Sequence, residues 1–333
     1  MLDSDALALL KNAHNLLAFS GGADSTALFH LLLEAGISFD IAHVNYHTRD
    51  HSNREAEAAH LLARKHGVEC HLFDADIDGQ NFEHEARLIR YGFFEALMEE
   101  HQYSNLITAH QLDDRLEWFL MQLSKGAGLP EMLGMQTIQQ SEGYRLVRPL
   151  LRQSKQALIT YLQDRGLSWF EDESNRDEKY KRNYFRHHFA TPLLDAYPKG
   201  IAKSFDFLEE DATHLLEQIS VDRVDELYYF PTSSSRRSTL YAIDKSLKQN
   251  GFLMRQGDKE RLKSEECVVI GRRFIVTIGK CYTFIAPYLD IEMEKPFKEA
   301  CRKLQIEPKL RPYLSTSEAA FSTVVSLVSS ARP

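Results

Sequence analysis

Four short apolar segments, each followed by a segment with helical periodicity, constrain the fold of this 333-residue chain more than any other feature. The apolar segments have the length and composition of strands that are buried on both faces. Strands that alternate with helices are typical of an α/β fold with a doubly wound, Rossmann-like parallel sheet. The expected strands are Leu16–Phe19, Phe39–Asn45, Glu69–Phe73 and Asn105–Ala109, and the expected helices are Asp24–Glu34, Asn53–Lys65, Phe82–Glu100 and one after Gln111.

The second half of the chain predicts a smaller helical and α+β domain. A helical pattern over about 201–230 indicates a long connecting helix between two domains, 1–195 and 196–333. Pro231 and the serines at 233–235 mark the end of this pattern. A helix at Thr239–Asn250 and strands at Glu266–Ile270, Arg273–Ile278 and Tyr282–Ala286 are expected beyond it.

The stretch SGGADS, which joins the first expected strand to its helix, predicts a phosphate-binding turn. Glycines let a ligand approach the backbone closely, and the N–H groups at a helix start attract an anion. The stretch lacks the signatures of a Walker P-loop and of dinucleotide folds. It resembles the pyrophosphate loop of the N-type ATP pyrophosphatases, in which Asp24 would help to hold Mg²⁺. That resemblance implies that ATP contacts Ser20, Gly21, Gly22, Ala23, Asp24, Ser25 and His43.

Acidic residues gather just after the fourth expected strand. His110, Asp113, Asp114 and Glu117 lie at the start of the helix that follows. Crowded carboxylates usually serve a cation or a proton, although acidic residues also occur at ordinary helix N-termini. Because parallel strands end at one edge of a sheet, we expect this cluster to lie beside the phosphate loop and to bind a metal ion or a substrate amine.

Two further stretches combine basic and aromatic side chains. Arg87, Arg90 and Tyr91 lie on neighbouring helical turns and are candidates for contacts with phosphate or a nucleobase, or else form a solvated basic stripe. Arginines beside aromatic rings suit RNA phosphates and unstacked bases. The segment 169–189 has this composition and supplies the candidates Asp172, Asn175, Arg182, Asn183 and Arg186.

Taken in order, these motifs resemble those of the tRNA(Ile)-lysidine synthetase family over about residues 14–195. Four positions depart from the family pattern: Tyr46, Gln111, Trp118 and Lys125. The matching residues are 20–25, His43-Val44-Asn45 with Arg49, Ala86-Arg87 with Arg90-Tyr91, Thr108-Ala109-His110 with Asp113, Asp114 and Glu117, Arg148–Leu151, and Trp169 with Asp172, Asn175, Arg182, Asn183 and Arg186.

The resemblance implies an adenine nucleotide alpha hydrolase-like fold and a two-step reaction. ATP adenylates the C2 oxygen of the wobble cytidine in an isoleucine tRNA with a CAU anticodon. The ε-amine of free lysine then displaces AMP and leaves lysidine. Codon reading changes from AUG to AUA, and the amino-acid identity of the tRNA changes from Met to Ile.

Roles for individual residues follow from the resemblance. Asp24 would hold Mg²⁺, and Asp114 and Glu117 would hold either the lysine ammonium group or a second Mg²⁺. His110 is our own hypothesis for the base that takes the amine proton. The catalytic candidates are therefore Asp24, His110, Asp114, Glu117 and Arg186, and the candidates for substrate or tRNA binding are Arg87, Arg90, Tyr91, Asp113, Asp172, Asn175, Arg182 and Asn183.

Charge is distributed unevenly along the chain, whose net charge is −8. Residues 1–235 carry 22 Lys and Arg against 37 Asp and Glu, whereas residues 236–313 carry 17 against 10. A basic region attached to an acidic catalytic region favours a C-terminal domain that grips a polyanion, here the tRNA. We expect the affinity for tRNA to fall steeply with salt.

Several classes of protein fit the sequence less well. The four cysteines are scattered and form no Cys-x-x-Cys pair, which argues against a tRNA thiolation enzyme or a zinc ribbon. The acidic N-terminus and the lack of long apolar runs favour a cytoplasmic protein without a membrane partner. A homodimer is compatible with the resemblance. A nucleotide-binding regulator without chemistry is the competing class, and ATP consumption would separate it from an enzyme.

Overall fold

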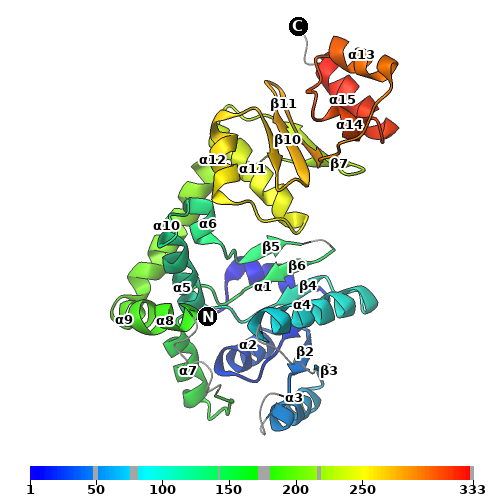
Figure 1. The fold of residues 1–333 in the computed structure, drawn as a ribbon. Helices are drawn as coiled ribbons and strands as arrows, with labels where there is room; N and C mark the ends of the chain where they lie inside the picture. Colours follow the sequence, from blue (N-terminus) through cyan, green and yellow to red (C-terminus); the bar gives the residue numbers. More distant parts are fainter. Residues whose placement is uncertain (48–51, 76–81, 142, 172–180, 216–218, 331–333) are drawn as a thin grey trace. The chain divides into compact units, whose positions relative to one another are not determined.

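Six strands in the order β3-β2-β1-β4-β6-β5 form the sheet that organises the N-terminal part of the chain (Figure 1). The computed structural model describes residues 1–47, 52–75, 82–141, 143–171, 181–215 and 219–330. Neighbouring strands run parallel except β5, which pairs antiparallel with β6. The predicted α/β fold is thereby confirmed. The strands are β1 Asn15–Ala18, β2 Asp40–Asn45, β3 Cys70–Asp74, β4 Asn105–Ile107, β5 Ile138–Gln140 and β6 Arg145–Val147.

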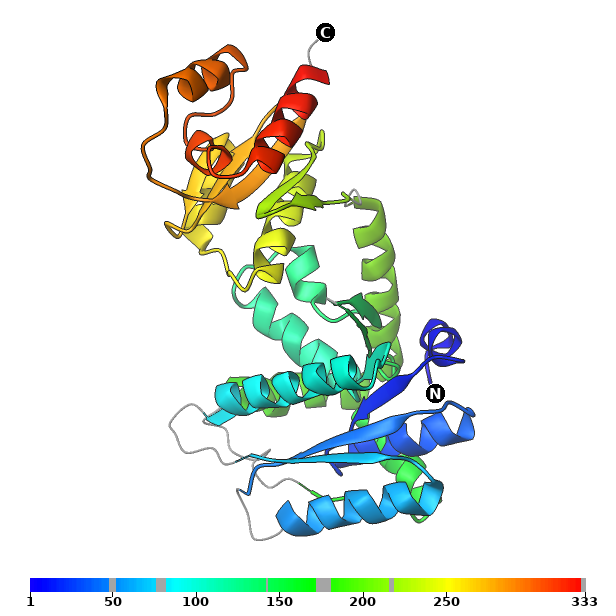
Figure 2. The ribbon, with the colours of Figure 1, turned by 90° about the vertical axis from the view of Figure 1, so that its right-hand side faces the viewer.

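Consecutive residues of the central strands are buried on opposite faces of this sheet. Leu17 and Ile41 belong to the hydrophobic cluster beneath α2, α3 and α7, whereas Leu16 and Ala42 belong to the cluster beneath α4. Figure 2 shows α4 and α3 on opposite sides of the strands. Each aliphatic side chain buried in this way contributes about 1.5–3 kcal/mol, which explains why the strands read as continuous apolar runs.

Helices cover both faces of the sheet and continue to the end of this part of the chain. They are α1 Ser4–Leu10, α2 Ala23–Glu34, α3 Ser52–His66, α4 Phe82–Glu100, α5 Leu112–Leu123, α6 Leu129–Leu133, α7 Lys155–Asp164, α8 Lys181–Phe185, the π-helix η2 Arg186–Ala190, α9 Thr191–Ala196 and α10 Pro198–Leu215. By its internal contacts the chain divides into an N-terminal unit, Met1–Glu209, and a C-terminal unit, Glu210–Pro333.

A five-stranded antiparallel sheet in the order β7-β8-β11-β10-β9 forms the centre of the C-terminal unit. One hydrophobic cluster joins it to α11 and α12, and a second joins it to α13, α14 and α15. The elements are β7 Asp222–Val224, β8 Leu227–Pro231, α11 Arg236–Gln249, α12 Gln256–Ser264, β9 Cys267–Ile270, β10 Phe274–Ile278, β11 Tyr282–Pro287, α13 Lys295–Lys303, α14 Arg311–Leu314 and α15 Glu318–Ser330.

The prediction of a single helix over 201–230 is wrong in its second half. The helix α10 ends at Leu215, and two strands, β7 and β8, occupy most of 222–231. Leu227 and Phe230 are fully buried in β8, which pairs with the distant strand β11. This long-range pairing outweighs the local helical pattern. None of the described helices, α10 included, is long and apolar enough to cross a membrane.

Candidate active site

The loop Ser20–Ser25 connects the carboxyl end of β1 to α2. Residues 108–111 leave β4 at the same edge of the sheet, because β4 is the parallel neighbour of β1. Isolated bridges add Phe170 beside Gly22 and Leu150 beside Gln111. The structure therefore brings the glycine loop and the acidic segment to the edge at which doubly wound sheets bind ligands.

Two glycines shape the loop. Gly21 has a φ of +78°, which other residues adopt only with strain, and a Cβ there would lie 3.4 Å from the Phe170 ring. Gly22 is the N-cap of α2 and offers the helix no side-chain acceptor. The hydroxyl of Ser25 donates to the Gly22 carbonyl at 3.1 Å and lies 3.1 Å from the Ser20 hydroxyl. These hydrogen bonds fix the loop at the start of α2. The first backbone N–H groups of a helix have no partner within the helix and can bind an anion.

Asp24, in the first turn of α2, carries a buried carboxylate oxygen that has no hydrogen-bond partner among the described residues. Burial raises the pKa of Asp24 to about 6, while Lys155 lowers it and the nearby Asp114 and Asp113 raise it. A buried carboxylate without a partner is costly, and a bound cation would remove that cost. Mg²⁺ prefers oxygen ligands and is usually bound by one or two carboxylates together with phosphate groups. Asp24 beside the Ser20–Ser25 loop therefore fits that ion.

Two carboxylates and two guanidinium groups form an ion-pair network beside the loop. Arg186 Nε donates to Glu117 Oε1 at 2.5 Å, and Arg182 Nε donates to Glu117 Oε2 at 2.8 Å. Arg182 Nη2 also donates to Asp114 Oδ1. The Glu117 side chain is 1% exposed, whereas that of Arg182 is 48% exposed. The acidic pair is therefore held by two arginines, of which Arg182 is the more open to solvent.

The start of α5 is fixed by a reciprocal capping arrangement. The Gln111 side chain accepts from Asp113 N at 2.5 Å, and Asp114 Oδ2 accepts from Gln111 N at 3.1 Å. Asp113 Oδ2 in turn accepts from Lys155 N at 2.9 Å, at the start of α7. Gln111, a departure from the family pattern, thus retains a capping function. The Asp113 carboxylate is directed to a neighbouring helix.

His110 lies beside this network with its Nδ1 2.9 Å from Thr108 Oγ1. Burial lowers the pKa of His110 to about 4, Asp114 opposes this shift, and Arg148, Arg182 and Arg87 add to it. The imidazole is therefore neutral at pH 7 and has one ring nitrogen able to accept a proton.

The other predicted contacts come from β2 and α4. His43 is buried, and its Nδ1 donates to the Phe19 carbonyl at 3.0 Å, just before the loop. Burial lowers the pKa of His43, which favours the neutral ring. On α4, the Arg87 guanidinium lies 4.6 Å from the centroid of the Tyr91 ring. Arg90 lies on the same helix, where its charge acts on the Tyr46 hydroxyl.

Part of the predicted site falls outside the described residues. Asp172 and Asn175 belong to this part, as does Arg49. Asn183 is described and is buried in α8.

Three residues near the site were not assigned a role from the sequence. The buried Arg148 donates to the Gln136 carbonyl at 2.9 Å and adds positive charge near His110. Lys155 affects Asp24 through its charge, and Phe170 covers Gly21. Arg148 stood in a family motif, but nothing in the local sequence indicated Lys155 or Phe170, because both reach the site through long-range folding.

Trp118, a second departure from the family pattern, docks on the segment after α5. Its indole Nε1 donates to the Glu131 carbonyl at 2.8 Å. Gly134 has a φ of +49°, and a Cβ there would lie 2.0 Å from the same indole nitrogen. The indole therefore occupies space that only a glycine leaves open, and it holds α6 against α5.

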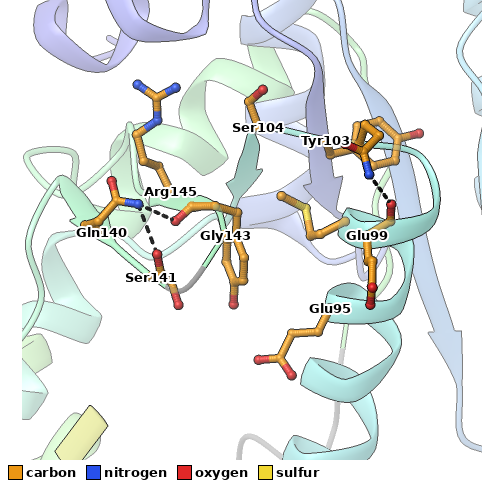
Figure 3. A pocket seen from close by; sticks show the side chains of 11 residues that line it. Glu95, Glu99, Tyr103, Ser104, Gln140, Ser141, Gly143 and Arg145 are labelled. Atoms are coloured by element: carbon orange, nitrogen blue, oxygen red, sulfur yellow. Dashed lines mark hydrogen bonds between the residues drawn. The ribbon is translucent and has the colours of Figure 1, made fainter. Parts of the chain in front are cut away.

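A cavity of about 870 Å³ lies at the opposite edge of the sheet (Figure 3). Its walls come from the end of α4 and from the residues that precede β4 and β6. Glu95, Glu99 and Arg145 are among the lining residues, but the glycine loop and the acidic segment are not. The cavity is therefore separate from the candidate active site.

Comparisons with known proteins extend over both units. The PP-loop domain family matches residues 4–193. The tRNA(Ile)-lysidine synthase of Wolinella succinogenes is 44% identical over 91% of this chain and 93% of its own. The enzymes of that name from Helicobacter pylori strain J99 and Campylobacter jejuni strain RM1221 are 43% and 37% identical, over 92% and 97% of this chain and 90% and 99% of their own.

One solved structure supports the fold. The U34-tRNA thiolase NcsA of Methanococcus maripaludis matches with a TM-score of 0.53 and 16% identity, over 66% of this chain and 78% of its own. At that identity the likeness concerns the fold alone.

Proposed function

This chain belongs to the tRNA(Ile)-lysidine synthase family of ATP-using PP-loop enzymes, and we propose that it joins free lysine to C2 of the wobble cytidine in the CAU-anticodon isoleucine tRNA. The names of the relatives indicate that the substrate is the isoleucine tRNA, and the PP-loop domain indicates that the enzyme uses ATP. The observation that carries the proposal is the buried, unpaired oxygen of Asp24 beside the Ser20–Ser25 loop. Such a carboxylate fits the metal ion that accompanies the phosphates of ATP.

In the first step the C2 oxygen of cytidine attacks the α-phosphorus of ATP, and the bond to the departing pyrophosphate breaks. The N–H groups and hydroxyls of Ser20–Ser25 bind the phosphates. Asp24 would hold Mg²⁺, which when bound neutralises phosphate charge. Arg186 would stabilise the charge that develops on the phosphates. The support is that Glu117 fixes its side chain and that its charge acts on Asp24 in the loop.

In the second step the ε-amine of lysine attacks C2, the C2–O bond breaks, and AMP leaves with that oxygen. The amine must lose a proton, and we assign its acceptance to His110. If Nδ1 donates to Thr108, Nε2 carries the free lone pair. A bound phosphate would raise the low pKa of His110 towards neutrality, because negative charge favours the imidazolium.

Asp114 and Glu117 are proposed to bind the lysine ammonium group or a second Mg²⁺. Both carboxylates contact arginines in this structure, so either ligand requires a rearrangement. Arg182 is the more exposed arginine and can turn towards a phosphate at lower cost than Arg186. Asp114→Asn separates the two assignments, because it raises the KM for lysine in the first case and the Mg²⁺ requirement in the second.

The C-terminal unit is proposed to bind the body of the tRNA. The support is the composition of residues 236–313, which contain 17 basic and 10 acidic residues, whereas acidic residues outnumber basic ones in the rest of the chain. A homodimer and a cytoplasmic location stay predictions, which sedimentation and fractionation would test.

The function is tested by measuring AMP and pyrophosphate release with the CAU-anticodon transcript, with and without lysine. We expect pyrophosphate release to require the wobble cytidine, and stoichiometric AMP release to require lysine as well. ATP turnover without any dependence on tRNA would contradict the proposal. Asp24→Asn should abolish both signals, and His60→Ala, on the exposed face of α3, should leave them unchanged.

A further inference from the structure

Metal-ligating side chains gather at the amino-terminal edge of the sheet, opposite the Ser20–Ser25 loop. These residues lie at or just before the starts of the parallel strands β1 to β4. Because the strands start side by side at this edge, the pairing of the strands brings the side chains together. One ligand atom from each of Asp40, Glu69 and His71 lies within 4.8 Å of the other two. The neighbouring residues are His14 before β1 and His101 and Tyr103 before β4.

Strand geometry explains why the three ligand atoms converge. Glu69 and His71 are two residues apart, so their side chains leave β3 on the same side, whereas Cys70 between them packs on the hydrophobic core. Glu69 N donates to Asp40 Oδ1 at 3.1 Å, and the Glu69 carbonyl accepts from Ile41 N at 2.9 Å. The pairing of β2 with β3 therefore fixes the spacing of the group.

A hydrogen-bond chain orients the imidazole of His71. The Tyr103 hydroxyl donates to Asp40 Oδ2 at 2.7 Å, and its oxygen lies 2.9 Å from His71 Nε2. Because the hydroxyl proton is directed to Asp40, Nε2 carries a proton and Nδ1 keeps its lone pair. Metal-ligating histidines are usually held in this way, through the ring nitrogen that does not bind the metal. Figure 3 shows the Tyr103 hydroxyl on the side away from Gln140.

We propose that Asp40, Glu69 and His71 form a binding site for a divalent transition metal ion of the Zn²⁺ type. One imidazole and two carboxylates are ligands that such an ion takes, whereas Mg²⁺ prefers oxygen alone. Ligand atoms around a tetrahedral Zn²⁺ lie about 3.3 Å apart, given bonds of about 2.0–2.1 Å. The exposed Glu69 side chain can close the remaining distance.

The surroundings of the group favour binding of such an ion. His14 Nε2 lies 3.9 Å from Asp40 Oδ2, and the His101 ring lies 4.6 Å from the His71 ring. The His14 side chain is 53% exposed, which leaves a path from solvent. The ion would tie together the starts of β2 and β3.

The test is titration of the metal-free full-length protein with Zn²⁺ alone, followed by calorimetry and thermal unfolding. We expect one saturable equivalent in the wild type, a higher Tm with the ion, and a loss of affinity of at least about tenfold in Glu69→Gln and His71→Ala. Tyr103→Phe should also weaken binding, because it releases the imidazole. His60→Ala, an exposed histidine of α3, should bind like the wild type.

Cobalt(II) spectra add a readout of the ligands. A nitrogen and oxygen site gives no thiolate charge-transfer band, whereas ligation by Cys70 would give one. Glu69→Gln is nearly isosteric and exposed, so it tests the proposal even if His71→Ala fails to fold. The proposal is overturned by a thiolate band, by the lack of saturable binding, or by unchanged affinity in Glu69→Gln.

Discussion

Arg186 Nε donates to Glu117 Oε1 at 2.5 Å, and this pair joins the start of η2 to the buried face of α5. Glu117 is fully buried and also accepts from Arg182. The two guanidinium groups compensate a carboxylate that could not otherwise be buried. The network thereby fixes η2, a π-helix of the kind often found at functional sites.

Replacing Glu117 with Gln should destabilise the protein. The amide keeps one acceptor but removes the close counter-charge of Arg186, whose Nη2 then has only Asp114 Oδ1 at 3.8 Å, and the loss costs about 1.5–3 kcal/mol. Urea unfolding measures the loss. The matched control is Glu299→Gln, because Glu299 pairs with Arg302 on the surface at 3.7 Å and should matter by less than about 0.5 kcal/mol. Equal losses in the two variants would contradict the account.

Asp24 should make the protein less stable as pH rises from about 4 to about 6. Its pKa is raised from 3.8 to about 6 on folding, so the folded protein binds more protons than the unfolded chain in that window. Asp24→Asn removes this penalty and should be more stable than the wild type by about 2–3 kcal/mol at pH 7. Urea unfolding near pH 4 and at pH 7 measures the difference, and a constant difference would contradict the raised pKa.

His110→Ala should separate the two chemical steps. Loss of the proposed base should slow lysine transfer by about 10²–10⁴-fold, whereas adenylation needs no base on the amine and should change far less. Pyrophosphate release reports the first step and AMP release the second. An equal loss of both would refute the role of His110 in accepting the proton.

Gly134→Ala should destabilise the protein through a collision with Trp118. A Cβ at Gly134 would meet the indole, and overpacking of this kind costs about 1–3 kcal/mol. The control is Gly126→Ala, because Gly126 also has a positive φ, of +72°, but no atom lies within 4 Å of the added Cβ. Thermal unfolding should show the larger loss at Gly134. Similar losses in the two variants would mean that strain from the positive φ, and not the collision with Trp118, causes the destabilisation.

Much of the N-terminal unit could be predicted because its strands and helices carry strong local patterns. The strands β1 and β2 lie close to the expected ranges, and α4 has the expected bounds. The apolar runs are continuous because both faces of the sheet are covered, and this signal is local. The glycine loop was recognisable for the same reason, since its turn is encoded in six consecutive residues.

Features set by distant partners could not be predicted. The strand β8 pairs with β11, which lies far along the chain. The local sequence does not reveal this partner, and its apolar pattern alone indicates a continued helix. Lys155 reaches Asp24 and Asp113 only after α7 packs beside α2. The ion pairs of Arg182 and Arg186 with Glu117 likewise join residues that are far apart in the sequence. The spacing of residues within each motif identified candidate functional side chains. It did not predict which acidic and basic side chains form ion pairs.

The most direct measurement is the transfer of labelled lysine into the CAU-anticodon isoleucine transcript in the presence of ATP and Mg²⁺. The control transcript differs only in carrying uridine at the wobble position. We expect incorporation that requires both ATP and the wobble cytidine. Incorporation that survives the change to uridine, or AMP release by folded protein with no lysine in the RNA, would contradict it.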